Sequence, residues 1–207
     1  MTTSAVDLVT SDGVRLQAEQ SESREPRAVV VILHPHPAMG GDMFTPVPAA
    51  FFAAMDERQL SGLRFNFHGV GRSEGQHDHG QAEQMDVQAA VDGAAGMATN
   101  VPLIMAGWSW GADLSLMSDD DRVAGWLLCA APLKVHAPQA MPARLVHAPK
   151  IFAVPEHDHI SPPAATTATT AHWTNARVVT LADTDHFFGG QLPALVTLLD
   201  QLVGEVS

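Results

Sequence analysis

The chain has 207 residues, of which 46% are apolar and 16% charged, a composition typical of a globular protein with a sizeable core. Its formal net charge is −12, and its 11 Lys and Arg residues form no basic cluster, which argues against nucleic acid and anionic membranes as partners. No run approaches ~18 apolar residues, so we expect no membrane span. A start without a signal-peptide pattern and a lone Cys129, which excludes an internal disulfide, favour a cytoplasmic protein.

Apolar runs of strand length alternate with helical patterns along the chain. An Asp-Gly turn within residues 11–13 predicts an antiparallel hairpin formed by residues 6–10 and 14–20. The β-branched run 28–33 predicts a central strand covered on both faces. Further strands are expected at 63–67, 101–106, 123–131, 150–154 and 176–181, and helices at 45–59, 81–98, 112–117, 162–172 and 191–203. This alternation predicts an α/β fold with a mostly parallel central sheet, an N-terminal antiparallel hairpin and helices on both faces.

Residues 107–111, Gly-Trp-Ser-Trp-Gly, lie between an expected strand and an expected short helix. The pattern G-x-S-x-G in this context is typical of a nucleophile elbow, a turn so tight that the serine backbone is strained and the flanking positions must be glycine. Such a turn projects Ser109 Oγ from the carboxyl end of the sheet, at the amino end of a helix. Ser109 is therefore the candidate nucleophile.

Two later stretches supply candidate partners for Ser109. Residues 151–160 run from a strand into Asp158, with Glu156 as a competing carboxylate. Residues 182–190 place His186 on a loop beside aromatic residues, where a histidine is suited to act as a general base. The chain order of serine, acid and histidine is the one found in α/β-hydrolases.

The sequence resembles the α/β-hydrolase superfamily over nearly its whole length, and within it a group of small bacterial serine hydrolases related to the dienelactone hydrolases. The resemblance rests on four motifs in the right order, at residues 34–41 (His-Pro-His-Pro, then Gly40-Gly41), 64–75, 107–111 and 185–188. Two positions depart from it, because relatives usually carry Arg where His68 stands and Gly where Pro155 stands. The resemblance implies a single α/β-hydrolase domain over residues 1–207 without a substantial cap, since the interval 132–149 is short and broken by prolines.

The resemblance also implies a mechanism in which His186 takes the Ser109 proton, Asp158 orients the imidazole, and an acyl-enzyme forms on Ser109. Ester hydrolysis with small or short-chain acyl groups is the expected reaction, thioester hydrolysis is the alternative, and no cofactor is expected. Dienelactone hydrolase uses a cysteine nucleophile, so Ser109 argues against assuming its substrate.

The loop at residues 34–41 is expected to contribute to an oxyanion hole. One donor should be the N–H of Trp110, the residue after the nucleophile. Pro35 and Pro37 have no N–H, and relatives commonly use the second residue after the first histidine, which selects the backbone of His36. The candidate substrate-contacting residues are His34, Met39, Trp108 and Phe187.

Two other classes of function compete with this interpretation. The 11 histidines include the pairs 34/36, 77/79 and 157/159, which suggest a metal-dependent hydrolase, although no helix places two of them one turn apart and we expect no metal. A non-catalytic binding protein with this fold would usually lack one position of the triad, and none is missing here. We expect a small-molecule ester or thioester as partner and a monomer or a small homo-oligomer.

Overall fold

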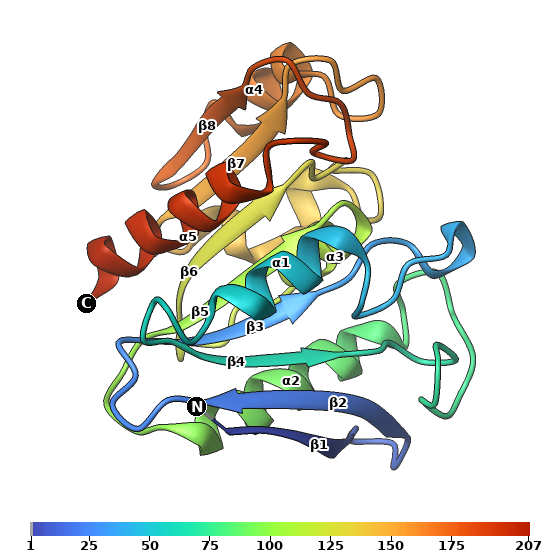
Figure 1. Cartoon of the computed structure of the whole chain (residues 1–207). Coiled ribbons are helices and arrows are strands. Elements are labelled where there is room, and N and C mark those ends of the chain that lie inside the picture. Colours follow the sequence, from blue (N-terminus) through green and yellow to red (C-terminus); the bar gives the residue numbers. More distant parts are fainter. Residues whose placement is uncertain (1) are drawn as a thin grey trace.

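The computed structural model describes residues 2–207, which form one eight-stranded sheet and five α-helices. The strands are β1 (Thr2–Val9), β2 (Arg15–Glu22), β3 (Val29–Leu33), β4 (Ser61–Phe65), β5 (Leu103–Trp108), β6 (Val123–Cys129), β7 (Lys150–Pro155) and β8 (Ala176–Leu181). The helices are α1 (Pro46–Ala54), α2 (Glu83–Met97), α3 (Trp110–Ser115), α4 (Pro163–Thr170) and α5 (Leu192–Val206). The predicted α/β fold is confirmed, and Figure 1 shows how these elements follow one another.

The strand order in the sheet is β1-β2-β4-β3-β5-β6-β7-β8. β1 pairs with β2 and β2 with β4 in antiparallel fashion, while β4, β3, β5, β6, β7 and β8 are parallel. The predicted N-terminal hairpin is therefore present at the edge of an otherwise parallel sheet. Since parallel strands share a direction, the loops after β3, β5, β7 and β8 leave from the same edge, on the right in Figure 1.

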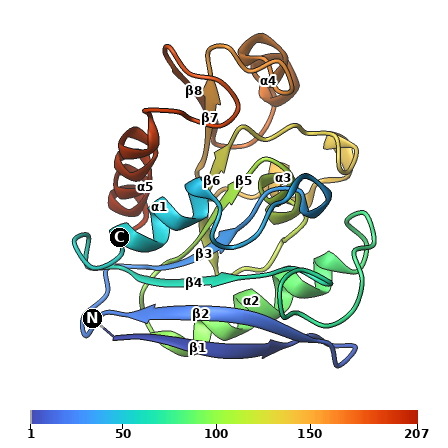
Figure 2. The ribbon, with the colours of Figure 1, turned by 45° about the vertical axis from the view of Figure 1, so that its right-hand side comes forward.

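Helices cover both faces of the sheet, as the sequence predicts. Successive residues of β3 alternate between two cores, with Val29 and Val31 on the side of α2 and α3, and Val30 and Ile32 on the side of α1 and α5. Figure 2 shows α1 and α5 on one face, opposite α2 and α3. β3 is buried at every position because both of its faces are covered, which explains its continuous β-branched sequence.

The segment after α1 differs from the prediction. The helix ends at Ala54 instead of continuing to Gln59, because the chain turns at Met55 and Gln59 adopts φ +54°. Gly62 lies inside β4, where a Cβ atom would stand 2.8 Å from Cγ of Met55. Glycine at this position therefore lets the end of α1 pack closely on the sheet.

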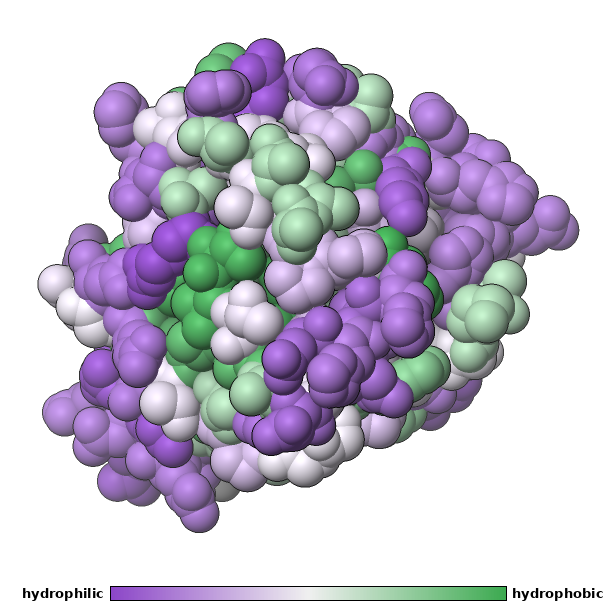
Figure 3. All heavy atoms as spheres, turned by 90° about the horizontal axis from the view of Figure 1, so that it is seen from above, coloured by the Kyte–Doolittle hydropathy of each residue, from purple (hydrophilic) through white to green (hydrophobic). Residues whose placement is uncertain are grey.

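The connection from β6 to β7, residues 130–149, contains two 3₁₀ turns and no α-helix, and all of its residues are described. The expected absence of a substantial cap at this place is confirmed. Seen from the end that carries β8 and α4, the surface is largely polar, with an apolar patch left of centre and smaller apolar areas elsewhere (Figure 3). Within residues 2–207, each helix is too short or too polar to cross a bilayer.

Candidate active site

Ser109 stands in the turn between β5 and α3. Its backbone adopts φ 54° and ψ −119°, a strained conformation for a residue with a side chain, and its N–H donates to Cys129 O (2.8 Å). A Cβ on Gly107 would lie 2.6 Å from Ala112 Cα, and one on Gly111 would lie 2.4 Å from His34 O. Both glycines are thus required by close backbone contacts, as expected for a nucleophile elbow.

Three side chains from distant parts of the sequence form one hydrogen-bonded chain. Nε2 of His186 lies 2.9 Å from Oγ of Ser109, and Nδ1 of His186 donates to Oδ2 of Asp158 at 2.8 Å. Asp158 and His186 are buried, within the loops that follow β7 and β8. With Nδ1–H donated to the carboxylate, Nε2 is left to accept a proton from the Ser109 hydroxyl.

The carboxylate of Asp158 is held on both oxygens. Oδ1 accepts the N–H groups of Ile160 (2.8 Å) and Ser161 (2.9 Å), while Oδ2 accepts from His186. Burial raises the pKa of Asp158, but these hydrogen bonds outweigh it and leave the pKa below its usual value. Glu156, the competing acid, is exposed and accepts the N–H of Asp183 (3.0 Å), so the structure joins Asp158 and not Glu156 to His186.

Trp108 fixes the loop that carries His186. Its indole Nε1–H donates to the carbonyl oxygen of His186 at 3.1 Å, and its ring is almost fully buried. The ring also meets the exposed Phe187 edge-on, with centroids 6.2 Å apart. Trp108 therefore supports the loop that carries His186. No local sequence pattern predicts this supporting role.

The loop after β3 lies against the elbow, since the close approach at Gly111 is to the carbonyl of His34. Its backbone bends sharply, because Gly41 N–H donates to His36 O (3.1 Å) and a 3₁₀ turn spans Pro37–Met39. The Ala38 N–H donates to Nδ1 of the His36 ring (3.1 Å), and prolines 35 and 37 carry no N–H. The His36 N–H is thus the remaining donor at this end of the loop.

The other predicted donor, Trp110, is the first residue of α3, where an N–H has no acceptor within its own helix. Its indole ring is buried against Phe67 and next to the rings of His36 and His77. The backbone of Trp110 and not its ring is therefore the part suited to meet an oxyanion at Ser109.

A pocket of about 300 Å³ opens beside Ser109 and His186. We call it the apolar pocket; its lining residues are Pro35, His36, Met39, Gly40, Gly41, Thr45, Pro46, Trp108, Ser109, Ile160, His186 and Phe187. Met39 (86% exposed) and Phe187 (64% exposed) stand at its rim. Three of the four candidate substrate contacts, Met39, Trp108 and Phe187, thus lie at this pocket.

The prediction that His34 contacts substrate is wrong. Its side chain is 0% exposed, Nδ1 donates to Pro35 O (2.7 Å), and Nε2 accepts the N–H of Phe67 (3.1 Å). Burial lowers the pKa of His34 to about 4, so the ring is neutral at physiological pH. The His34 ring thus joins the loop after β3 to the segment that follows β4.

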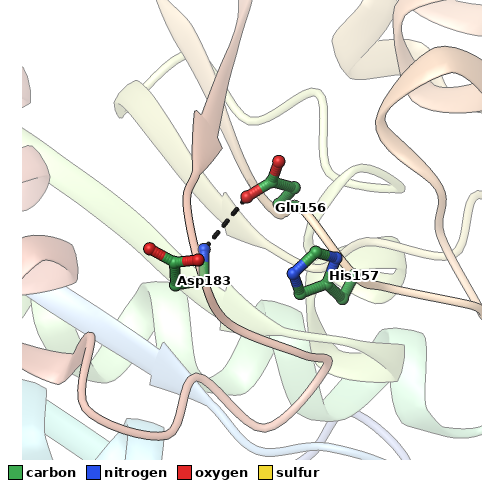
Figure 4. A group of neighbouring side chains, drawn as sticks. All are labelled: Glu156, His157 and Asp183. Atoms are coloured by element: carbon green, nitrogen blue, oxygen red, sulfur yellow. Dashed lines mark hydrogen bonds between the residues drawn. The ribbon is translucent and has the colours of Figure 1, made fainter.

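The histidine pairs considered as metal ligands do not bring three ligand atoms together, although the ring of His77 packs against those of His36 and His79. Among residues 2–207, the only group of three side chains whose ligand atoms lie within 4.8 Å of one another is Glu156, His157 and Asp183. Figure 4 shows these side chains on the loops after β7 and β8. All three are exposed to solvent. His68, at the position where relatives usually carry Arg, is buried and hydrogen-bonds Asp86.

Sequence reasoning also missed Asp113 on α3. This fully buried carboxylate accepts the N–H groups of Leu133 (2.8 Å), Lys134 (2.8 Å) and Val135 (3.0 Å), and so fixes the loop after β6 beside the elbow. Burial raises its pKa to about 6. An acid inside the short, mostly apolar helix predicted at residues 112–117 was the available signal, because a carboxylate in a buried helix requires partners.

Comparison with known proteins gives a short sequence match and long structural ones. No model of a protein family matches the chain. An uncharacterized protein from Rickettsia prowazekii is 34% identical over 79 residues, which are 38% of this chain and 33% of that protein. The match therefore spans about a third of the relative's length.

The structural matches extend over the whole chain. A homologue of α/β serine hydrolases from Coxiella burnetii has a TM-score of 0.85 and 26% identity, covering 100% of this chain and 99% of its own. An α/β serine hydrolase without a lid from Xanthomonas campestris has a TM-score of 0.86 and 24% identity over 99% and 95% of the two chains. Est1E from Butyrivibrio proteoclasticus, in a structure with bound ferulic acid, has a TM-score of 0.80 and 17% identity over 98% and 99%.

These likenesses leave the narrower relationship to dienelactone hydrolases a prediction. They agree with the sheet order, the elbow and the uncapped site edge described above, which together with the full-length match define the fold. The chain belongs to the α/β-hydrolase superfamily.

Proposed function

We propose that this protein is a serine hydrolase that cleaves carboxylic esters through an acyl-enzyme on Ser109. The observation that carries the proposal is the continuous chain Ser109–His186–Asp158, with separations of 2.9 and 2.8 Å, at a strained elbow beside an apolar pocket. A surface serine has no such partners, and the strain at Ser109 is typical of a functional position.

In the first step, His186 Nε2 takes the Ser109 proton while Oγ attacks the ester carbonyl. The N–H groups of His36 and Trp110 stabilise the tetrahedral oxyanion, and Asp158 stabilises the imidazolium that forms. The imidazolium then protonates the leaving alkoxide, which departs as alcohol. Water, deprotonated by the same imidazole, cleaves the acyl-enzyme and regenerates Ser109.

The dimensions of the site support small substrates. The apolar pocket holds about 300 Å³, and the short β6–β7 connection contributes no apolar roof that would desolvate a long acyl chain. The same triad serves thioesters, whose leaving thiolate needs no different protein group.

A panel of acyl esters and thioesters of graded chain length, measured with wild type and Ser109→Ala, tests the proposal. We expect short-chain esters to be cleaved with the highest kcat/KM, and turnover by Ser109→Ala to fall by ~10⁴-fold or more. Better turnover of thioesters would shift the assignment to a thioesterase. Equal activity of Ser109→Ala and wild type would refute the serine mechanism.

A further inference from the structure

A second hollow meets the apolar pocket at Ser109. This cleft of about 440 Å³ shares His36, Met39, Ser109 and Ile160 with the apolar pocket and continues away from His186. We call it the basic cleft; its remaining lining residues are His79, Trp110, Pro132, Lys134 and Val135. Ser109 therefore lines two adjoining spaces, and the basic cleft is the one that contains an ammonium group.

The charge of the basic cleft contrasts with that of the molecule. The chain has 23 acidic residues and a formal net charge of −12, yet the cleft is lined by Lys134 and by no carboxylate. The sequence contains two lysines, and the other one, Lys150, is fully buried. Lys150 donates to the carbonyls of Val146, Ala148 and Thr174, so it serves the interior. The exposed lysine of a strongly acidic protein thus lies in the same cleft as the nucleophile.

The lysine is held in place by groups of the site itself. Its backbone N–H and those of its two neighbours donate to Asp113, which lies on the helix that starts at the elbow. Its ammonium donates to Ile160 O (3.0 Å), two residues after Asp158. An ammonium has three N–H donors, so two remain for a ligand in the cleft.

The position of His186 orients the substrate between the two spaces. His186 lines the apolar pocket but not the basic cleft. Because the imidazolium must protonate the leaving oxygen, the alcohol departs on the side of the apolar pocket, and the acyl group extends into the basic cleft.

We infer that the preferred substrate is an ester of an apolar alcohol with an acyl group that itself carries a carboxylate, a monoester of a small dicarboxylic acid. Lys134 is then a specificity-determining residue that binds the distal carboxylate. The inference rests on the proposed function: Oγ–acyl bond formation releases the alcohol, and water releases the dicarboxylate.

Two esters of nearly the same shape, which differ in the charge at the distal end of the acyl group, test the role of the carboxylate. Benzyl hydrogen succinate carries the distal carboxylate, and benzyl succinamate carries a neutral amide at the same place. We expect wild type to favour the anionic ester in kcat/KM. Lys134→Gln should lower kcat/KM for the anionic ester roughly tenfold and change it less than about twofold for the neutral ester. Lys134→Arg should retain most of the preference, and added salt should weaken it.

A matched control removes a positive charge elsewhere. Arg24→Gln, at an exposed position in the β2–β3 connection on the opposite edge of the sheet, changes the net charge equally and should leave both rates unchanged. A loss of kcat/KM for both esters in Lys134→Gln would show that Lys134 only supports Ile160.

Three results would overturn the inference without touching the proposed function. One is an equal kcat/KM of wild type for benzyl hydrogen succinate and benzyl succinamate. Another is that wild type cleaves neither of these two esters, although it cleaves neutral short-chain esters in a Ser109-dependent way. The third is a higher kcat/KM for 4-carboxybenzyl butanoate than for benzyl hydrogen succinate, because the preferred carboxylate would then belong to the alcohol and not to the acyl group. Failure of the proposed function would give a different result from these three, because wild type and Ser109→Ala would then cleave every ester at the same rate.

Discussion

At the scale of single residues, the two acids after β7 have different environments. Asp158 is buried, holds hydrogen bonds on both oxygens and has a lowered pKa, whereas Glu156 is exposed and binds a backbone N–H. An ionised carboxylate against Nδ1–H keeps the imidazole in the tautomer that can accept the Ser109 proton. A charge at Glu156 makes no contact with His186.

Asp158→Asn should lower kcat for ester hydrolysis by ~10⁴-fold, because an amide no longer stabilises the imidazolium and favours the wrong tautomer. Glu156→Gln should stay within about threefold of wild type, since it lies outside the hydrogen-bonded chain. Initial rates with a short-chain ester give both numbers. A mild Asp158→Asn phenotype beside a severe Glu156→Gln phenotype would move the acid to Glu156.

The role of His36 divides between its backbone and its ring. The N–H is the proposed oxyanion donor, and ring Nδ1 accepts the N–H of Ala38 at the start of the 3₁₀ turn. His36→Asn keeps the backbone N–H and supplies a side-chain oxygen to the turn, so activity should stay within about tenfold of wild type. His36→Pro removes the N–H and should lose ~10²–10³ in kcat.

Circular dichroism melts of both His36 variants show whether the loop still folds. If His36→Asn is folded and as inactive as His36→Pro, the imidazole itself participates and the backbone assignment is wrong.

At the scale of secondary-structure elements, the sequence predicts most strands and helices because burial leaves a local signature. β3 is β-branched throughout since both faces are covered, and the hairpin turn needs Gly13, which adopts φ +88°. The end of α1 could not be predicted in this way. It depends on the packing of Met55 against Gly62 on the face of the sheet that α1 covers, which is a tertiary contact.

The candidate site was predictable to the extent that its residues follow strands in a recognisable order. Ser109, Asp158 and His186 each come after a parallel strand, so the topology alone brings them to one edge. The supports were not predictable. The indole of Trp108 and the ring of His34 act through hydrogen bonds to residues 78 and 33 positions away, which no sequence period reveals.

Asp113 links α3 to the loop after β6, so its removal should destabilise the fold. Asp113→Ala leaves three backbone N–H groups without an acceptor and should lower Tm by roughly 5–10 °C, measured by calorimetry at pH 7. Asp113→Asn keeps one oxygen and should lie between this variant and wild type. A melting temperature of Asp113→Ala equal to that of wild type would show that water replaces the carboxylate at no cost.

At the scale of the whole molecule, acid stability depends on groups buried during folding. His34 is neutral in the folded protein, with a pKa of about 4 against an ordinary value of 6.5. Its Nε2 accepts the Phe67 N–H. Protonation of the ring would replace this hydrogen bond with a repulsive contact between the Nε2–H and the Phe67 N–H. Because the folded-state pKa is lowered, this stabilisation is present above pH 6.5 and is lost as the pH falls towards 4.

Wild type and His34→Gln should therefore differ less in acid than at neutral pH. The glutamine variant is expected to be less stable at pH 7, and the difference in unfolding free energy should narrow by on the order of 3 kcal/mol between pH 7 and pH 4. Urea unfolding at both pH values measures it. The pKa values of Asp86 and Asp113 are also raised. These two groups are present in both proteins, so their contributions cancel in the difference in unfolding free energy between wild type and His34→Gln. A difference independent of pH would mean that His34 is not the group responsible.

Covalent labelling with a fluorophosphonate tests the central claim, that the elbow, His186 and Asp158 together activate Ser109. The reagent reacts with an activated serine hydroxyl and not with ordinary surface serines. We predict one adduct per chain by intact mass, mapped to the peptide that contains Ser109. Ser109→Ala should take up no label. Equal labelling of Ser109→Ala, or an adduct on another serine of the wild-type protein, would contradict the account.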